Sequence, residues 1–92
     1  MKKYIKVYLD YFGYGEHSFI PCEMLGCGKR SGPPHHIQNK QMGGSKNKDH
    51  IDNLIGLCDK HHDWAHSPNT REKQERLKKI HLDFIKQFLM TA

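Results

Sequence analysis

Long apolar segments are absent from the sequence. The longest stretch without Asp, Glu, Lys or Arg, residues 31–39, is mostly polar, whereas a membrane-spanning helix needs about 20 consecutive apolar residues. No apolar segment follows Lys2 and Lys3 to form an export signal. We therefore expect a cytoplasmic protein and exclude a transmembrane one.

Cysteine and apolar residues are also scarce. The 92 residues include three cysteines, an odd number that disulfide bonds cannot pair completely. Hydrophobic residues make up 36% of the chain, and chains of this size usually supplement a small core with a metal, disulfides or oligomerisation. We therefore predict one domain, residues 1–92, that depends on a bound metal.

Basic residues outnumber acidic ones, and histidine is frequent. The formal net charge is +5 and the chain contains eight histidines. A basic chain favours an anionic partner such as nucleic acid, and histidine is the commonest metal ligand. Five of the histidines fall into two tight groups, at residues 35–36 and 61–66.

The pattern of apolar residues predicts an α+β fold. β-Branched and aromatic residues alternate along residues 4–9, which favours an N-terminal strand. Residues 35–37 are expected to be extended after two prolines, and residues 54–58 read as a short buried strand. A short helix is predicted at 60–66, and an amphipathic C-terminal helix at about 70–90.

Two separated pairs of ligands have the spacing of a zinc site. Cys22 and Cys27 form a C-x4-C pair, and Cys58 and His61 follow about thirty residues later. Tetrahedral zinc prefers cysteine and histidine, and closing such a site would supply folding free energy that a small core lacks. We predict structural Zn²⁺ here; the alternative is three buried free cysteines and a surface histidine.

A second group of histidines contains no sulfur. His35 and His36 are adjacent on an extended segment, while His62 and His66 share one helix face because they are four residues apart. His61 lies about 100° around the helix from His62, so one helix can serve both groups. A ligand set without thiolate is typical of a working cation; the alternative is ordinary surface histidines.

The order of these motifs resembles the HNH endonuclease family, as a stand-alone, phage-like member. The resemblance implies a small ββα-metal (His-Me finger) core stapled by a zinc site, to which the N-terminal strand and C-terminal amphipathic helix are added. In the zinc-containing subset of the family four cysteines are usual, and here His61 replaces one of them. The matching motifs, within residues 22–66, are His35-His36-Ile37, Gly43-Gly44, Asn53-Leu54-Ile55, Leu57-Cys58 and His61-His62-x3-His66.

The resemblance also implies roles for individual residues. The first histidine of the pair, His35, would ligate the catalytic metal, and the second, His36, would act as general base. Neighbouring residues on a strand project to opposite faces, which agrees with this division. Asn53 matches the asparagine that pins the loop and orients the base. His62 and His66 match the remaining ligands, with phosphate contact as the alternative for His66.

The implied function is a metal-dependent DNA endonuclease that leaves 5′-phosphate and 3′-hydroxyl ends, by nicking or double-strand cleavage. One divalent cation, Mg²⁺, Mn²⁺, Ni²⁺ or Zn²⁺, would stabilise the leaving 3′ oxygen. Basic residues near the cleft in sequence would contact phosphates without reading bases. These residues are Lys29, Arg30, Lys40, Lys46 and Lys48.

Two other functions fit the sequence. A non-catalytic zinc-binding nucleic-acid module would need the cysteines but not His35, His36 and His62. A ribonuclease or a structure-selective nickase would share the chemistry but not the substrate. We expect a phage protein in the cytoplasm of a bacterial host cell, with a second copy or another phage protein as partner, since 92 residues leave no room for a recognition domain.

Overall fold

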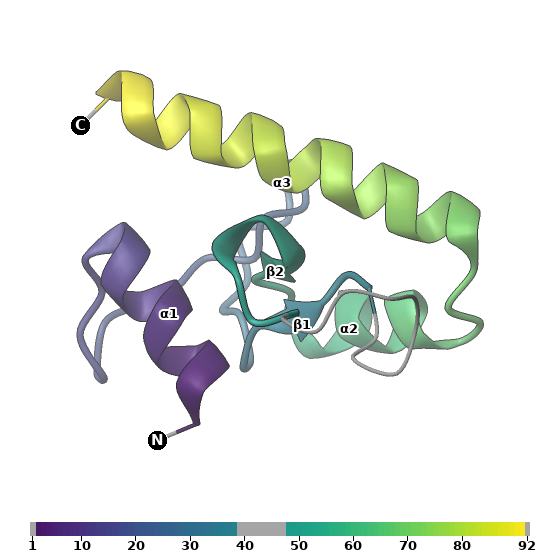
Figure 1. Ribbon diagram of the computed structural model, residues 1–92, viewed down its shortest axis with the longest axis horizontal. Coiled ribbons are helices and arrows are strands. Elements are labelled where there is room, and N and C mark those ends of the chain that lie inside the picture. Colours follow the sequence, from purple (N-terminus) through teal and green to yellow (C-terminus); the bar gives the residue numbers. More distant parts are fainter. Residues whose placement is uncertain (1, 39–47, 92) are drawn as a thin grey trace.

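The computed structural model describes residues 2–38 and 48–91. In Figure 1 the longest helix, α3, runs along one side of the molecule, and α1, the strands and α2 lie beneath it. The α+β class predicted from the sequence is confirmed. The elements of the described residues are α1 (Lys3–Phe12), β1 (His35–His36), the 3-10 helix η1 (Ile51–Asn53), β2 (Leu54–Ile55), α2 (Asp59–His66) and α3 (Arg71–Thr91).

The predicted N-terminal strand is wrong, because residues 4–9 belong to helix α1. Tyr8, Leu9 and Phe12 are buried on one face of this helix. The Phe12 ring packs against aromatic rings of α3, with centroids 5.5 Å from Phe84 and 5.0 Å from Phe88. These tertiary contacts outweigh the β propensity of the segment.

The two strands form one antiparallel pair. His35 pairs with Ile55, and His36 pairs with Leu54. The backbone N–H of Ile37 donates to the Asn53 carbonyl at 2.9 Å, which continues the pairing by one residue. Leu54 and Ile55 are completely buried, so β2 forms the centre of the molecule.

The two later helices confirm the sequence prediction closely. Helix α2 begins directly after Cys58, and α3 extends to Thr91. The first turn of α3 is capped by Thr70, whose Oγ1 accepts a hydrogen bond from the backbone N–H of Lys73 at 3.2 Å. The Lys73 Nζ in turn donates to the Trp64 carbonyl at 2.7 Å, which ties the end of α2 to α3.

Two apolar clusters flank the strands. One surrounds the cysteines and contains Ile37, Ile55, Leu57, Ala65 and Leu77. The other joins α1 to α3 and contains Tyr8, Phe12, Leu54 and Ile85. No helix within residues 2–38 and 48–91 is both long enough and apolar enough to cross a bilayer.

A buried polar network connects these parts of the fold. The side chains of Glu23 and His81 are fully buried, with His81 Nδ1 2.6 Å from Glu23 Oε1. Glu23 Oε2 also accepts hydrogen bonds from Tyr8 Oη at 2.6 Å and from the Gly56 N–H at 2.8 Å. His81 Nε2 lies 2.6 Å from the Ile51 carbonyl. Because a carbonyl only accepts, this nitrogen carries a proton.

Candidate metal centres

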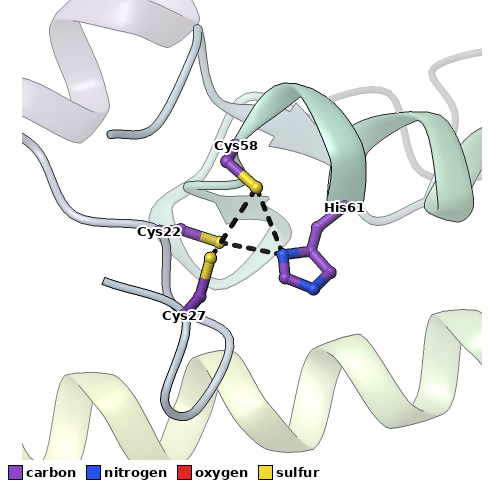
Figure 2. A group of neighbouring side chains, drawn as sticks. All are labelled: Cys22, Cys27, Cys58 and His61. Carbon is purple, nitrogen blue, oxygen red and sulfur yellow. Dashed lines mark hydrogen bonds between the residues drawn. The ribbon is translucent and has the colours of Figure 1, made fainter. Parts of the chain in front are cut away.

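Four ligand side chains predicted from the sequence converge between a loop and the start of α2, as Figure 2 shows. We name Cys22, Cys27, Cys58 and His61 the thiol site; their ligand atoms all lie within 4.8 Å of one another. The Sγ atoms of Cys27 and Cys58 are 3.8 Å apart, and Cys22 Sγ lies 3.5 Å from His61 Nδ1. A tetrahedral zinc ion needs edges of about 3.8 Å between sulfurs and about 3.5 Å between sulfur and nitrogen. The thiol site therefore could hold a metal ion such as zinc.

Glycines shape the loop that carries two of these cysteines. Gly26 and Gly28 have φ angles of 74° and 67°, a conformation that residues with a side chain rarely adopt. The backbone N–H of Cys22 donates to the Lys29 carbonyl at 2.8 Å, which closes the loop around Cys27. Both thiols are thereby held on the same side of the loop.

The thiols of the thiol site differ in their readiness to ionise. Burial raises the pKa of Cys22 to about 11. Burial also acts to raise the pKa of Cys58, but the backbone N–H groups of His61 and Lys60 at the start of α2, together with the neighbouring thiols, outweigh it and lower this pKa overall. All three cysteines are free thiols, so a cation that binds here displaces their protons.

The second group of predicted ligands also comes together. We name His35, His62 and His66 the histidine cluster; their ligand atoms lie within 4.8 Å of one another. The Nε2 atoms of His62 and His66 are 3.1 Å apart. Two nitrogen ligands of one cation are separated by about 3.0 Å in an octahedral site and about 3.3 Å in a tetrahedral zinc site. The observed separation lies between these values.

One buried nitrogen atom of the histidine cluster, His35 Nε2, has no hydrogen-bond partner within residues 2–38 and 48–91. His35 is 3% exposed, and among the described residues its Nε2 is the one buried side-chain nitrogen or oxygen without a hydrogen-bond partner. Such atoms are rare in folded proteins because leaving them unpaired is costly. The His35 ring lies edge-on to both helix histidines, with centroids 5.1 Å from His62 and 4.8 Å from His66. A shared cation would satisfy the unpaired nitrogen.

Burial keeps two side chains of this cluster, His35 and His62, uncharged at pH 7. Desolvation, followed by the charges of His66 and His62, lowers the pKa of His35 to about 4. Desolvation, followed by the charge of His66, also lowers the pKa of His62. Both side chains are therefore neutral imidazoles at pH 7, which is the form that binds metal ions.

His36 points away from the histidine cluster. Its Nε2 lies 2.7 Å from Asp49 Oδ1, and its ring packs on Tyr4 of α1 with centroids 4.7 Å apart. Sequence reasoning missed Asp49 because an isolated carboxylate has no spacing signal. Its position a few residues before Asn53 was the sole available indication.

The Asn53 side chain connects two backbone segments. Its Oδ1 accepts a hydrogen bond from the Gln38 N–H at 2.8 Å. Its Nδ2 donates to the carbonyls of Gln38 at 3.1 Å and Lys48 at 2.9 Å. Asn53 therefore holds together the residues on either side of 39–47.

The basic residues proposed to contact phosphate have different surroundings. Lys29 and Arg30 are exposed. Lys48 is 6% exposed and its Nζ donates to Gln38 Oε1 at 2.8 Å; its contact with phosphate stays a prediction. Lys40 and Lys46 lie outside the described residues, as do the predicted Gly43 and Gly44.

Comparisons of the chain with protein-family models, with curated proteins and with solved structures give no significant match. An assignment of function therefore rests on the chemistry of the thiol site, the histidine cluster and the residues around them.

Proposed function

We propose that this chain is a metal-dependent DNA endonuclease of the HNH type, built on a ββα-metal core. The observation that carries the proposal is the buried Nε2 of His35, which has no hydrogen-bond partner in the described part of the chain and belongs to a ring that lies edge-on to His62 and His66. The order of β1, β2 and α2 supports the same proposal, because the elements follow one another as expected for that core and the histidine ligands come from the first and the last of them.

The two ligand groups suit different tasks. The thiol site offers four soft ligands, the closed set typical of structural zinc. The histidine cluster offers three, which leaves positions open for substrate and water, as in catalytic sites. A divalent cation in the cluster, Mg²⁺, Mn²⁺, Ni²⁺ or Zn²⁺, supplies Lewis-acid stabilisation of charge on the phosphate and on the leaving 3′ oxygen.

The residues beside the cluster carry the proton chemistry. His36 removes a proton from the attacking water, a role for which imidazole is well suited at neutral pH. The new P–O bond forms as the bond to the 3′ oxygen breaks, and this oxygen takes a proton from solvent, which leaves a 5′-phosphate and a 3′-hydroxyl. Asn53 holds Gln38 close to Lys48 and so supports the chain segment that follows His36.

Charge supports DNA as the substrate. The net charge of +5 attracts a polyanion, and Lys29 and Arg30 are exposed for phosphate contacts. We include Lys40 and Lys46 in the same role. Such contacts give affinity that falls with salt and carries little sequence preference.

Plasmid cleavage tests this proposal. Protein with zinc restored at the thiol site is assayed with Mg²⁺, Mn²⁺, Ni²⁺ or Zn²⁺ added singly, alongside His36→Ala and the exposed-histidine control His17→Ala. We expect metal-dependent cleavage that falls at least about 100-fold in His36→Ala and is unchanged in His17→Ala. The product ends are expected to be 5′-phosphate and 3′-hydroxyl.

Two other results would contradict the proposal. Absence of cleavage with every cation, together with equal salt-sensitive DNA binding by all three proteins, would favour a non-catalytic zinc-binding nucleic-acid module. Cleavage of RNA but not of DNA would make the chain a ribonuclease.

A further inference from the structure

The His36 side chain has a carboxylate neighbour, Asp49, to which the proposed reaction gives no role. Asp49 Oδ1 lies 2.7 Å from His36 Nε2, within the short range of charge-assisted hydrogen bonds. The two side chains are 17% and 15% exposed, so water competes weakly for this bond. A carboxylate held this close to one ring nitrogen leaves the other nitrogen for different chemistry.

The chemistry of the two partners determines which nitrogen carries the proton. An ionised carboxylate only accepts hydrogen bonds, so a bond to Asp49 requires a proton on His36 Nε2. In the neutral ring Nδ1 is then the unprotonated nitrogen. That lone pair is the one able to remove a proton from water.

A second contact restricts the ring. The Tyr4 ring of α1 packs on His36 at 4.7 Å between centroids with an interplanar angle of 54°. Rotation of the imidazole would break the contact with Tyr4 and the bond to Asp49 together. The ring is therefore held by two elements, α1 on one side and the segment before η1 on the other.

We infer that Asp49 is a positioning residue for His36: it fixes the tautomer with the proton on Nε2 and so presents Nδ1 as the proton acceptor for water. The inference rests on the proposed nuclease function for its catalytic consequence. Its structural part, the single tautomer of His36, is independent of any substrate.

The isosteric variant Asp49→Asn separates positioning from simple structural support. An asparagine keeps the shape, and its amide can donate to Nε2, which favours the opposite tautomer with the proton on Nδ1. The matched control is Asp52→Asn, which alters an exposed carboxylate three residues away. A purely structural role predicts that Asp49→Asn behaves as the wild type.

The first readout is nitrogen-15 NMR of the His36 side chain in zinc-loaded protein without DNA, at about pH 8.5, where histidine is ordinarily neutral. We expect one tautomer with the proton on Nε2 in the wild type and in Asp52→Asn, and a proton on Nδ1 in Asp49→Asn. A mixture of tautomers in the wild type, or the same tautomer in all three proteins, would overturn the inference.

The second readout is DNA cleavage. We expect Asp49→Asn to lower kcat about 10- to 100-fold with KM within about twofold of wild type, since the substrate contacts are retained. Unchanged kcat in this variant would overturn the catalytic part of the inference. If the wild type cuts no DNA while its NMR shows the expected tautomer, the proposed function fails and the assignment of Asp49 to the tautomer of His36 is supported.

Discussion

At the scale of single residues, the protonation state of His35 decides whether this side chain can bind a cation. The His35 side chain is buried, and protonating it would place a charge where little water can reach. The same burial that leaves its Nε2 without a partner therefore keeps the nitrogen available to a cation. The burial of this one nitrogen atom thus affects both its protonation and its ability to bind a cation.

This burial makes stability depend on pH. The folded pKa of His35, about 4, lies below the ordinary value of about 6.5, so between these pH values the unfolded chain binds more protons. The contribution of neutral, buried His35 to folding stability is therefore present at neutral pH, and it is lost as the pH falls from about 6.5 to about 4. From pH 7 to pH 5 we expect zinc-loaded protein to lose about 2 kcal/mol more than His35→Asn, measured by urea unfolding. Equal losses in the two proteins would contradict the burial of His35.

Residue type and spacing made much of the candidate site predictable. The thiol site and the histidine cluster could be recognised because cysteine and histidine are the side chains that zinc prefers, and their spacing limits which of them can share one ion. Asp49 could not be recognised, because its partner is defined only once the chain has folded. The hydrogen bond of Lys48 could not be predicted for a related reason, since a lysine in sequence does not reveal whether its amine reaches solvent or Gln38.

At the scale of elements, the knuckle of residues 22–27 and the strand β2 position everything around them. The knuckle has few apolar contacts at its tip, where Leu25 is 88% exposed, so we expect a bound metal ion to stabilise it further. Strand β2 is followed by Gly56, which packs against the knuckle and α1. Close packing holds β2 in place, whereas the side chains of the knuckle could in addition hold a metal ion.

Loss of one thiol should open the knuckle. We expect Cys27→Ser to lose zinc to a chelator under conditions in which the wild type retains one equivalent, because one of four ligands is weakened. The control Leu25→Ala, in the same turn, should retain zinc. Metal analysis and circular dichroism measure both effects. Retention of zinc by Cys27→Ser equal to that of the wild type would contradict the assigned ligand set.

Two glycines provide a matched test of packing. A Cβ at Gly56 would lie 2.6 Å from Tyr8 Oη, whereas one at Gly32 would lie 3.6 Å from its nearest neighbour, Asp59 Oδ1. Tyr8 cannot move without breaking its bond to Glu23, so we expect Gly56→Ala to cost about 1–3 kcal/mol of unfolding free energy. Gly32→Ala should cost less than about 0.5 kcal/mol. Similar urea midpoints for the two variants would refute this account of Gly56.

The elements differed in how far sequence could predict them. Helices α2 and α3 were predictable because capping residues, proline and an apolar stripe all agree. Helix α1 was not, because residues 4–9 alternate as a strand does. Their conformation is decided by Phe12 and its packing against Phe84 and Phe88, contacts between distant parts of the chain that no local pattern contains.

At the scale of the whole molecule, the buried pair Glu23 and His81 connects the knuckle to helix α3. Glu23 belongs to the knuckle, His81 to α3, Tyr8 to α1 and Ile51 to η1, and all four meet in one network. The knuckle and the segment leading into β2 are therefore held in one arrangement by the long C-terminal helix. The sequence contained no spacing signal for this network.

Breaking this pair should weaken the entire fold. Removing one partner leaves a buried polar group uncompensated, so we expect His81→Leu to cost about 3–5 kcal/mol. The variant His81→Gln, whose side-chain amide can still donate a hydrogen bond to Glu23, should lose less than His81→Leu. The exposed control His17→Leu should stay within about 0.5 kcal/mol of wild type. Urea unfolding measures all three, and a neutral His81→Leu would disprove the role of the network.

The most direct test of the central claim compares cation binding with cleavage in the same samples. Mn²⁺ is titrated into zinc-loaded protein, with occupancy followed by electron paramagnetic resonance and DNA cleavage measured at each step, for wild type and His62→Ala. We predict that the cleavage rate follows occupancy with the same midpoint, and that His62→Ala shifts both curves to higher Mn²⁺ concentration. A filled site without cleavage, or a cleavage curve unchanged in His62→Ala, would contradict the assignment of the histidine cluster as the catalytic metal site.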